Sequence, residues 1–404
     1  MPLRPPAGFI SAFYNPLQVP NAPTGVSASA GDAQATVSFT APTNVGGGAI
    51  TGYGAAAVKT SDGTTLTNTG ASSPITVTGL TNGSAYTMNV WAINSFGPSP
   101  FGTSGSVTPA APRGLFGGGV DASARVNTIQ YITISTVGNA IDFGDLNTAT
   151  DSQGSCSSTT RGLFAGGETT TIVNVIDYVT ISTTGNATDF GDLSLSRYAL
   201  AGCSSSTRGI FGGGQVSGGY SNVIDYVTIA SVGNATDFGD ITVARSRLGS
   251  CSSTTRGLFC AGFTGSVSNI IDYITIASVG NAIDFGDITV ATRGVASCSS
   301  ATRGLIGGGA NSSSTALNTI EYVTIASTGN ATDFGDLTST RINLASCSSS
   351  TIGVFAGGAD TASNRLNIID YVTIASTGNA TDFGDLLTVS TNLAACSSAH
   401  GGLA

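Results

Sequence analysis

Side chains that could take part in catalysis are scarce in this chain of 404 residues. It contains one histidine, His400, one lysine, Lys59, and two glutamates, Glu168 and Glu321. A single histidine cannot supply a cluster of histidine ligands for a metal, and its place near the end leaves no Ser–His–Asp triad. The phosphate-binding pattern GxxxxGK[ST] is also absent from the sequence. We therefore expect no enzymatic activity, no catalytic residue, no cofactor and no metal site.

Aspartates recur in the motif Asp-Phe-Gly-Asp, of which Asp189 and Asp192 form one copy. A Ca²⁺ ion needs about six to eight converging oxygen ligands, and two carboxylates in each copy fall well short of that number. Repetition in every unit favours a role in folding. We expect these aspartates to form turns and to pair with the arginine of a second recurring motif, Arg-Gly.

All seven cysteines lie in the C-terminal two-thirds of the chain. Six of them recur at one position of a repeat and are expected to be small buried residues near its axis, too far apart for disulfide bonds, which need Cα atoms within about 7 Å. Cys260 is the additional one. If Thr255 and Arg256 form a two-residue turn, Cys251 and Cys260 face each other, so a cross-strand disulfide stays open as a minor alternative.

The elements that position these residues belong to a repeat. The arginine of the motif Arg-Gly-(Leu/Ile)-Phe marks its phase, and the steps between copies are 48, 47, 48, 47, 49 and 48 residues. The markers are Arg113, Arg161, Arg208, Arg256 and Arg303, with Ile352 and His400 in the same slot. This period is typical of a β-propeller blade.

Each unit predicts four strands, for example 161–167, 174–182 and 186–193, with a strand of small residues such as 344–350 closest to the axis. The region begins at a second strand and ends with an innermost strand at 392–398. That last strand is expected to complete the first blade, which predicts a six-bladed ring clasped by its own C-terminus and without open sheet edges.

The order of marker residues within a unit is a strand ending in Gly-Gly, then Tyr178, then Phe190, then Arg197. This order resembles the kelch repeat, with phenylalanine in place of the usual tryptophan. The arginine of the outer loop is missing from the first and last units. The resemblance implies a kelch-like six-bladed β-propeller over residues 112–404.

Residues 19–111 read as a separate β-sandwich of about seven short strands, among them 33–40, 50–58 and 86–94. The stretch resembles a fibronectin type III domain. Phe39 stands at the position of the family's core aromatic residue, and Leu80 and Tyr86 match its tyrosine corner. A spacer role is what this resemblance implies.

Charge and hydropathy narrow the range of partners. The net charge of −9 comes entirely from residues 113–404, where 12 arginines face 21 acids. Nucleic acid binding needs a basic footprint, so we expect none. No apolar run approaches the ~18 residues of a spanning helix, so we expect no membrane insertion. The first residues lack the order of a signal peptide, so no secretory export is expected.

Residues 1–18 combine prolines with apolar side chains, which pure linkers do not carry. We interpret them as an N-terminal attachment arm with Phe9, Ile10, Phe13 and Tyr14 as assembly residues. The alternative is an arm that packs on its own domain.

The repeat units differ from one another mainly in two of their four connections. The turns typified by CSSSTRG and ASTGNATD hardly vary, whereas the loops after the second strand and after the outer strand vary in length and content. Successive connections alternate ends in an antiparallel sheet, so both variable loops are predicted at one face of the ring. Loops on a rigid scaffold often carry binding sites.

This predicted variable face carries seven arginines against the acids Asp121, Asp151, Glu168 and Asp360. Guanidinium groups and aromatic rings favour docking to an anionic or sugar-rich surface. The alternative is that the outer-loop arginines brace the blades. The predicted ligand-binding residues are Arg125, Arg197, Tyr198, Tyr220, Arg245, Arg247, Phe263, Arg293, Arg341 and Arg365.

An attachment arm, a fibronectin-like module and a Gly/Ser/Thr-rich propeller together resemble virion proteins of tailed bacteriophages, notably marine ones. The resemblance implies a structural, fibre or decoration protein, assembled in the host cytoplasm and carried on the extracellular particle. Its expected partners are other virion proteins, through the arm, and a host-surface glycan or anionic polysaccharide; a homo-oligomer is compatible with it. The competing class is a bacterial cell-surface adhesin or carbohydrate-binding protein.

Overall fold

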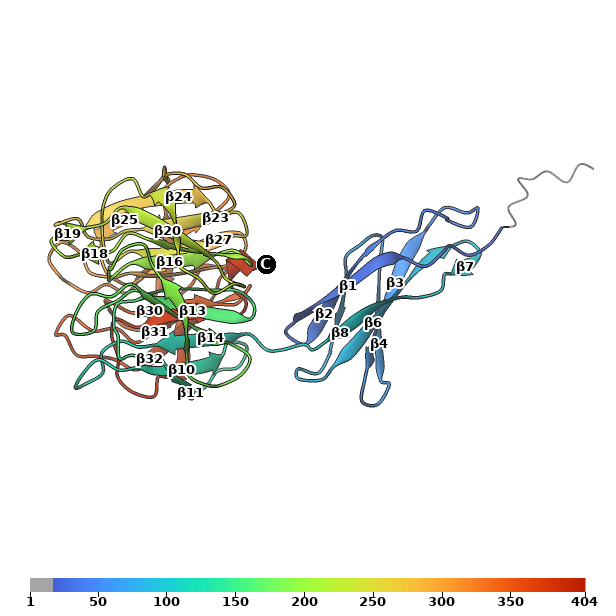
Figure 1. Ribbon diagram of the computed structural model, residues 1–404, viewed down its shortest axis with the longest axis horizontal. Coiled ribbons are helices and arrows are strands. Elements are labelled where there is room, and N and C mark those ends of the chain that lie inside the picture. The colour runs from blue at the N-terminus through green and yellow to red at the C-terminus, as the bar shows by residue number, and fades with distance from the viewer. Residues whose placement is uncertain (1–16, 404) are drawn as a thin grey trace, which may run out of the picture. The chain divides into compact units, whose positions relative to one another are not determined.

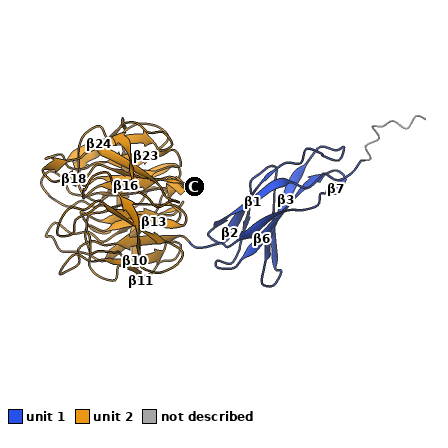
Figure 2. Cartoon of the chain, in the orientation of Figure 1, with its two compact units in different colours: residues 1–111 blue, residues 112–404 orange. Residues whose placement is uncertain are grey.

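The computed structural model describes residues 17–403 as strands joined by turns, with a single 3₁₀ helix, η1 (Gly401–Leu403). The prediction of an all-β chain is thus confirmed. Two compact units, residues 1–111 and 112–404, are coloured separately in Figure 2. Their division falls at the predicted boundary. The assembly residues Phe9, Ile10, Phe13 and Tyr14 lie outside the described residues.

The first unit consists of two antiparallel sheets (Figure 1). One has the order β1-β2-β5, from β1 (Thr24–Gly31), β2 (Gln34–Thr40) and β5 (Ile75–Thr78). The other has the order β4-β3-β6-β7, with β8 also paired to β6. Its strands are β3 (Gly52–Lys59), β4 (Thr65–Gly70), β6 (Tyr86–Asn94), β7 (Gly97–Pro98) and β8 (Gly102–Val107).

The core of the first unit follows the alternation of its strands. In β6, Tyr86, Met88 and Val90 are buried while the residues between them are partly exposed. The Tyr86 hydroxyl accepts a hydrogen bond from the backbone N–H of Thr81 at 3.0 Å, which is the predicted tyrosine corner. Phe39 lies in the same core, as expected.

The second unit contains six four-stranded antiparallel sheets. We call the strand with the recurring cysteine the inner strand and the others the second, third and outer strands. The predicted strands agree with these to within two residues at each end. The first sheet has β34 (Ala394–Ser397) as its inner strand, followed by β9 (Arg113–Gly117), β10 (Thr128–Thr133) and β11 (Ile141–Asp145). Its inner strand therefore comes from the C-terminal end of the chain.

The other five sheets are each built from consecutive segments of chain. The second has β12 (Gly154–Ser157), β13 (Arg161–Ala165), β14 (Val175–Thr180) and β15 (Thr188–Asp192), and the third has β16 (Ala201–Ser204), β17 (Arg208–Gly212), β20 (Val223–Thr228) and β21 (Thr236–Asp240). The fourth has β22 (Gly249–Ser252), β23 (Arg256–Cys260), β24 (Ser268–Thr275) and β25 (Ile283–Thr292). The fifth has β26 (Ala296–Ser299), β27 (Arg303–Gly307), β28 (Thr319–Thr324) and β29 (Thr332–Asp336). The sixth has β30 (Ala345–Ser348), β31 (Ile352–Ala356), β32 (Ile368–Thr373) and β33 (Thr381–Asp385). A small hairpin of β18 (Gln215–Val216) and β19 (Gly219–Tyr220) lies in one loop of the third sheet.

Serine hydroxyls join the six inner strands in a closed circle of hydrogen bonds. In each inner strand one buried serine donates from Oγ to the backbone carbonyl of the matching serine in the neighbouring strand, at 2.6–2.8 Å. Ser157 donates to Ser397, and Ser397 donates to Ser348, so the circle closes through β34. The serines are Ser157, Ser204, Ser252, Ser299, Ser348 and Ser397.

A second circle joins the outer strands and accounts for two of the recurring motifs. The asparagine before each Ala-Thr-Asp or Ala-Ile-Asp accepts a hydrogen bond from the backbone N–H of the last aspartate of Asp-Phe-Gly-Asp in the neighbouring sheet, at 3.0–3.1 Å. Asn186, for example, accepts from Asp145. These motifs hold neighbouring sheets together, in line with the expected folding role.

The expected pairing between these aspartates and the Arg-Gly arginines is wrong. None of the ion pairs found among residues 17–403 joins these two sets of residues. The guanidinium of Arg161 instead lies 4.7 Å from the ring centroid of Tyr178 and donates a hydrogen bond to the carbonyl of Ile229 in the next sheet. The charge is thus balanced by an aromatic face and a carbonyl dipole.

All seven cysteines are free and buried, as expected for the six repeated positions. Gly249 pairs with Cys260 and Cys251 with Leu258, so the turn of this hairpin lies at Thr254 and Thr255. The register assumed for a disulfide between Cys251 and Cys260 is therefore wrong by two residues.

Each repeated cysteine packs against a glycine of the neighbouring sheet, which belongs to an Arg-Gly motif in five cases and to Ile352-Gly353 in the sixth. A Cβ on Gly209 would lie 2.6 Å from Cys156 Sγ, closer than real contacts allow. We expect Gly209→Ala to destabilise the second unit by about 1–3 kcal/mol, because overpacking forces the strands apart. Adding Cys156→Ala will restore most of that loss, since it removes the clashing sulfur.

Urea denaturation of the two variants and of their double mutant measures this coupling. Gly219→Ala is the matched control, since a Cβ there meets nothing within 4 Å. Equal destabilisation by Gly209→Ala with and without Cys156→Ala would contradict the proposed packing.

Candidate functional site

Both variable loops of each repeat lie at one end of the second unit, which we call the variable end. Isolated backbone bridges join the loop before an inner strand to the loop after a second strand, for example Tyr198 with Gln215 and Ser246 with Phe263. The sequence differences between repeats therefore meet on one face.

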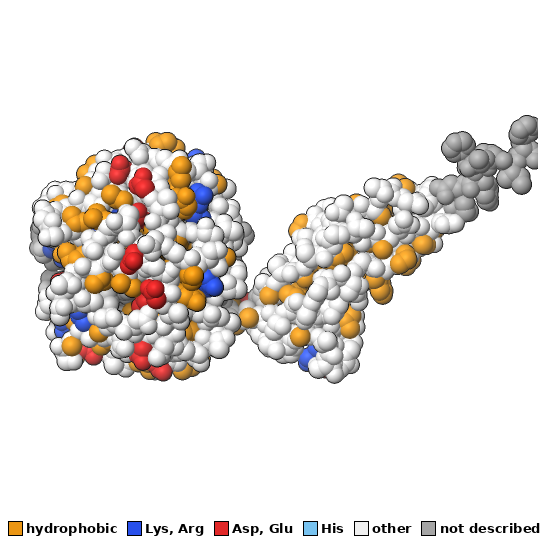
Figure 3. Space-filling view, viewed as in Figure 1, with side chains coloured by type: hydrophobic (Ala, Val, Ile, Leu, Met, Phe, Trp, Pro, Cys, Tyr) orange, Lys and Arg blue, Asp and Glu red, His pale blue; other side chains and the backbone are white. Residues whose placement is uncertain are grey.

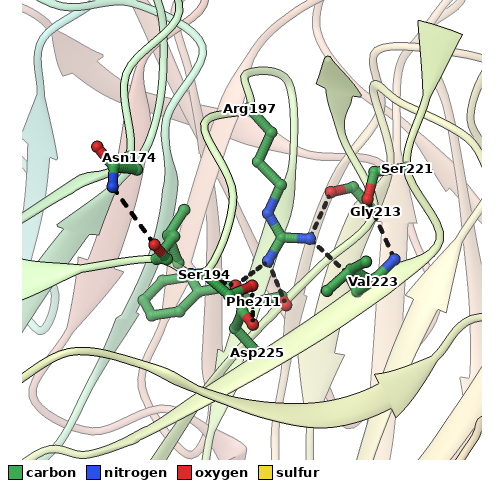
Figure 4. Close-up of polar contacts among 9 residues, drawn as sticks. Asn174, Ser194, Arg197, Phe211, Gly213, Ser221, Val223 and Asp225 are labelled. Carbon is green, nitrogen blue, oxygen red and sulfur yellow. Dashed lines mark hydrogen bonds and ion pairs between the residues drawn. The ribbon is translucent and has the colours of Figure 1, made fainter.

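Three of the predicted ligand-binding arginines are buried inside the sheets. The side chain of Arg197 is fully buried and donates to the carbonyls of Phe211 and Gly213 at 3.1 and 3.0 Å, and also to that of Val223 (Figure 4). Its guanidinium forms an ion pair with Asp225 at 2.9 Å. Burial lowers the pKa of Arg197 to about 10, which leaves it protonated at neutral pH.

Arg245 and Arg341 repeat this arrangement in the fourth and sixth sheets. Arg245 pairs with Asp272 at 2.8 Å and donates to the carbonyls of Ala261 and Phe259. Arg341 pairs with Asp370, and all four of these side chains are fully buried. A ligand in solvent cannot reach these arginines, which corrects their predicted place in a binding surface. The bracing alternative accounts for them.

Sequence reasoning missed the acidic partners of these arginines. They occupy the Asp of Ile-Asp-Tyr in the third strand, where they also accept hydrogen bonds from the preceding sheet, such as Ser194 Oγ to Asp225 Oδ1 at 2.6 Å. The sequence carried only a partial signal, because the second and fifth sheets keep Asp177 and Glu321 although threonines fill their arginine slots. In the first sheet, which has Ser390 in the arginine slot, the aspartate is replaced by Gln130.

Arg293 does not belong to the bracing set, because it stands one residue later in its loop than Arg197 does. Thr292 occupies the bracing slot of the fifth sheet, and Arg293 lies with its guanidinium 5.0 Å from the ring centroid of Phe263. It also donates to Ser314 at 3.1 Å. Tyr220 packs edge-on against Phe263 at 6.0 Å. These three predicted residues form one half-buried cluster in which Arg293 covers the aromatic ring.

Arg125 is paired with two acids of the variable end. It lies 3.4 Å from Asp151 and 3.1 Å from Glu168. Burial raises the pKa of Asp151, and the charge of Arg125 acts against this shift. Arg365 and Arg247 are half-buried and form no ion pair with another residue of the range 17–403. Figure 3 shows the acidic side chains spaced across the visible side of the second unit, without one dense patch.

A third circle of hydrogen bonds surrounds the axis at the variable end. In each repeat, the residue two positions before the first residue of the inner strand has a positive φ, in the range 51–67°. Its backbone N–H donates to the carbonyl of the matching residue in the neighbouring repeat at 2.7–3.0 Å. Left-handed φ values at non-glycine residues cost free energy and concentrate at functional sites. The six residues are Ser152, Ala199, Arg247, Gly294, Asn343 and Asn392.

A cavity of about 260 Å³ opens within this circle. Its apolar lining is Leu200, Leu248, Val295, Leu344 and Leu393, which occupy one position of five repeats. The second repeat has Gln153 at that position. Tyr198, Arg247, Asp151 and Glu168 lie around it. Of the ten predicted ligand-binding residues, the structure thus brings Tyr198 and Arg247 to this cavity.

Two of the residues that line this cavity carry a buried polar atom without a partner. Asp151 Oδ1 and Gln153 Oε1 are buried and accept no hydrogen bond from any described residue. Buried acceptors without partners are costly, so they are candidates for contact with a ligand. No sequence motif marked either residue.

The space between the inner strands narrows below the cavity and ends at His400. Two further spaces, of about 90 and 50 Å³, lie in turn along the inner strands. His400 Nε2 lies 3.2 Å from the carbonyl of Ser157, and its Nδ1 accepts from Gly402 N–H at 3.1 Å. Burial lowers the pKa of His400 to about 4, so the ring is neutral at pH 7. The lone histidine thus closes the narrow end.

Two further observations concern chemistry and membranes. Within residues 17–403, no three or more His, Cys, Asp or Glu side chains are grouped so as to hold a metal ion. The same residues contain no helix of the length and hydropathy needed to cross a membrane.

Comparison with known proteins identifies the first unit. Residues 21–108 match the family model of the fibronectin type III domain, so this part of the chain is a fibronectin type III domain, as predicted. No curated protein matches the chain.

Proposed function

We propose that residues 112–404 form a six-bladed, kelch-like β-propeller clasped by its own C-terminal strand. Six four-stranded sheets, each with its inner strand bonded to the next through serine, support this proposal. The pairing of β34 with β9 supports the clasp. The Tyr and Phe of every unit, and the buried Arg of the third, fourth and sixth sheets, lie in the order of the kelch resemblance, which supports this proposal.

On this scaffold we propose a non-enzymatic recognition role at the variable end. The observation that carries it is the cavity of about 260 Å³ whose lining departs from the repeat in the second sheet, with Gln153, Asp151 and Glu168. The other recurring side chains are used for contacts between sheets, which leaves the variable end as the place where the repeats differ in chemistry.

A sugar-rich ligand fits this end better than an anionic polymer. Three of the seven arginines counted for the variable face are neutralised within the sheets, and Arg125 is paired with two acids. The net positive charge that would attract a polyanion is therefore absent from these four positions. Polar side chains beside an apolar lining suit hydroxyl groups and the C–H faces of a sugar ring.

We place this recognition domain on a bacteriophage virion, as a tail fibre, appendage or decoration protein. The fibronectin type III domain serves as spacer, and the arm at residues 1–18 attaches to other virion proteins. The order of arm, spacer and recognition domain supports this proposal. The second candidate, a bacterial cell-surface adhesin, rests on the same cavity but needs a different attachment.

Two measurements test the proposal. The full chain, labelled with a fluorophore, will bind host cells or members of a glycan array, and free glycan will compete. Mass spectrometry will find its peptides in purified phage particles rather than in the bacterial surface fraction. Peptides confined to the bacterial surface would favour the adhesin, and absence of binding to both cells and glycans would overturn the recognition role.

A further inference from the structure

We propose that the cavity at the variable end binds a single neutral sugar residue at the free end of a glycan, and that side chains of the second repeat form hydrogen bonds with its hydroxyl groups. This inference rests on the proposed recognition function and narrows it to one site and one ligand chemistry.

The dimensions of the cavity select a ligand smaller than a drug molecule. Its volume of about 260 Å³ lies below the roughly 300–1,000 Å³ typical of drug-sized ligand pockets. The spaces beneath it shrink to about 90 and then 50 Å³ before His400 closes them. A chain of sugars cannot pass through such a dead end. The site therefore accepts a terminal residue, with the rest of the glycan leading back to solvent.

The second repeat is the one that has an amide at the leucine position of the cavity lining and a carboxylate two residues before it. Gln153 replaces the leucine or valine of five repeats, and its exposed fraction is 9%; that of Asp151 is 6%. Asp151 Oδ2 faces Arg125, which leaves Oδ1 free, and Gln153 Oε1 is also free. Both acceptors are enclosed in the free chain, so a ligand contacts them only after the two side chains rotate toward the cavity. Hydroxyl groups of a sugar would then supply the missing donors.

The remaining lining completes a surface for a neutral ring. Leu200, Leu248 and Leu344 offer apolar contact for C–H groups, and Tyr198 adds an aromatic side chain. Arg247, two repeats away from Gln153, supplies donors for hydroxyl or ring oxygens. The lining contains two acids, Asp151 and Glu168, and one base, Arg247. Arg125 forms ion pairs with both acids, so the formal charges around the cavity cancel. A charged sugar gains little here, so a neutral one is favoured.

Substitutions taken from the other repeats test the site without disturbing the fold. Gln153→Leu installs the residue found in the first, third, fourth and sixth repeats, and Asp151→Ser installs the residue of the fourth. Asn364→Ala, in an exposed variable loop and absent from the cavity lining, is the control. Saturation-transfer NMR and calorimetry of the full chain will use the methyl glycosides of glucose, galactose, mannose and N-acetylglucosamine, with glucuronate as the charged comparison.

We expect at least one neutral glycoside to bind, and Gln153→Leu and Asp151→Ser each to weaken its binding by at least ten-fold, with Asn364→Ala unchanged. Urea denaturation checks that every variant is folded. Tighter binding of glucuronate would overturn the neutral preference, and equal binding of a cyclic glucan without free ends would overturn terminal recognition. If cells or arrays bind the chain but Gln153→Leu has no effect, the cavity inference fails while the recognition function stands. If neither binds, both fail.

Discussion

Removal of residues 392–404 will abolish the cooperative folding of the second unit. These residues contain β34, the inner strand of the first sheet, and its loss leaves β9 with an unpaired edge. It also opens the serine circle at Ser397 on both sides and removes the buried side chains of Leu393 and Cys396. Loss of a largely buried strand exceeds what a unit of marginal stability tolerates.

Circular dichroism, urea denaturation and hydrogen exchange of the truncated and full chains measure this effect. A circular permutant of residues 112–404 is the matched control: residues 388–400 are joined directly to Arg113, and the chain ends at 387. Its new junction copies the short turn that joins the inner and second strands elsewhere, so we expect it to fold. A truncated chain with an unchanged urea midpoint would show that closure through β34 contributes nothing.

Arg245→Ala will destabilise the second unit by about 3–5 kcal/mol, since it leaves the buried carboxylate of Asp272 without its countercharge. It also removes donors from the carbonyls of Ala261 and Phe259. The first sheet shows how the same position is satisfied without charge, with Ser390 in the arginine slot and Gln130 accepting from Leu387 N–H at 2.7 Å. The double variant Arg245→Ser, Asp272→Gln is therefore expected to recover much of the loss.

Equilibrium urea unfolding of these variants measures both effects, and Arg247→Asn is the control two residues away. Asparagine tolerates the φ of +57° at this position, as Asn343 and Asn392 do at theirs, so its effect on stability will stay within about 0.5 kcal/mol. A loss for Arg245→Ala no greater than that of Arg247→Asn would mean that the buried ion pair is not what holds the fourth sheet.

Much of the fold was predictable, because its signals are local. The alternation in 86–94 and the tyrosine at its start placed β6 to the residue, and the period of the Arg-Gly motif placed every second strand. The positions of turns were predicted less reliably than the strands. The turn at Thr254 and Thr255 was predicted one residue too late, at Thr255 and Arg256. Periodicity alone does not choose between these two overlapping pairs.

The candidate site was predictable in its place and only partly in its members, of which Tyr198 and Arg247 were predicted. The loops that differ between repeats pointed to one end of the second unit, and the cavity lies there. Gln153 escaped notice, and Asp151 was counted only as an acid of the variable face, because neither forms a motif. Their importance comes from burial without a hydrogen-bond partner, which depends on neighbours from distant parts of the chain.

By itself, the sequence determined the all-β class, the fibronectin type III domain and the strands of each repeat. These follow from local signals, namely the alternation of apolar and polar side chains and the glycines at the ends of strands. Only the tertiary structure decided which arginines face solvent. Arg245 and Arg247 belong to one loop and look equivalent in the sequence. Arg245 is buried because the neighbouring third strand presents Asp272 to it, whereas the left-handed backbone at Arg247 brings that residue to the rim of the cavity.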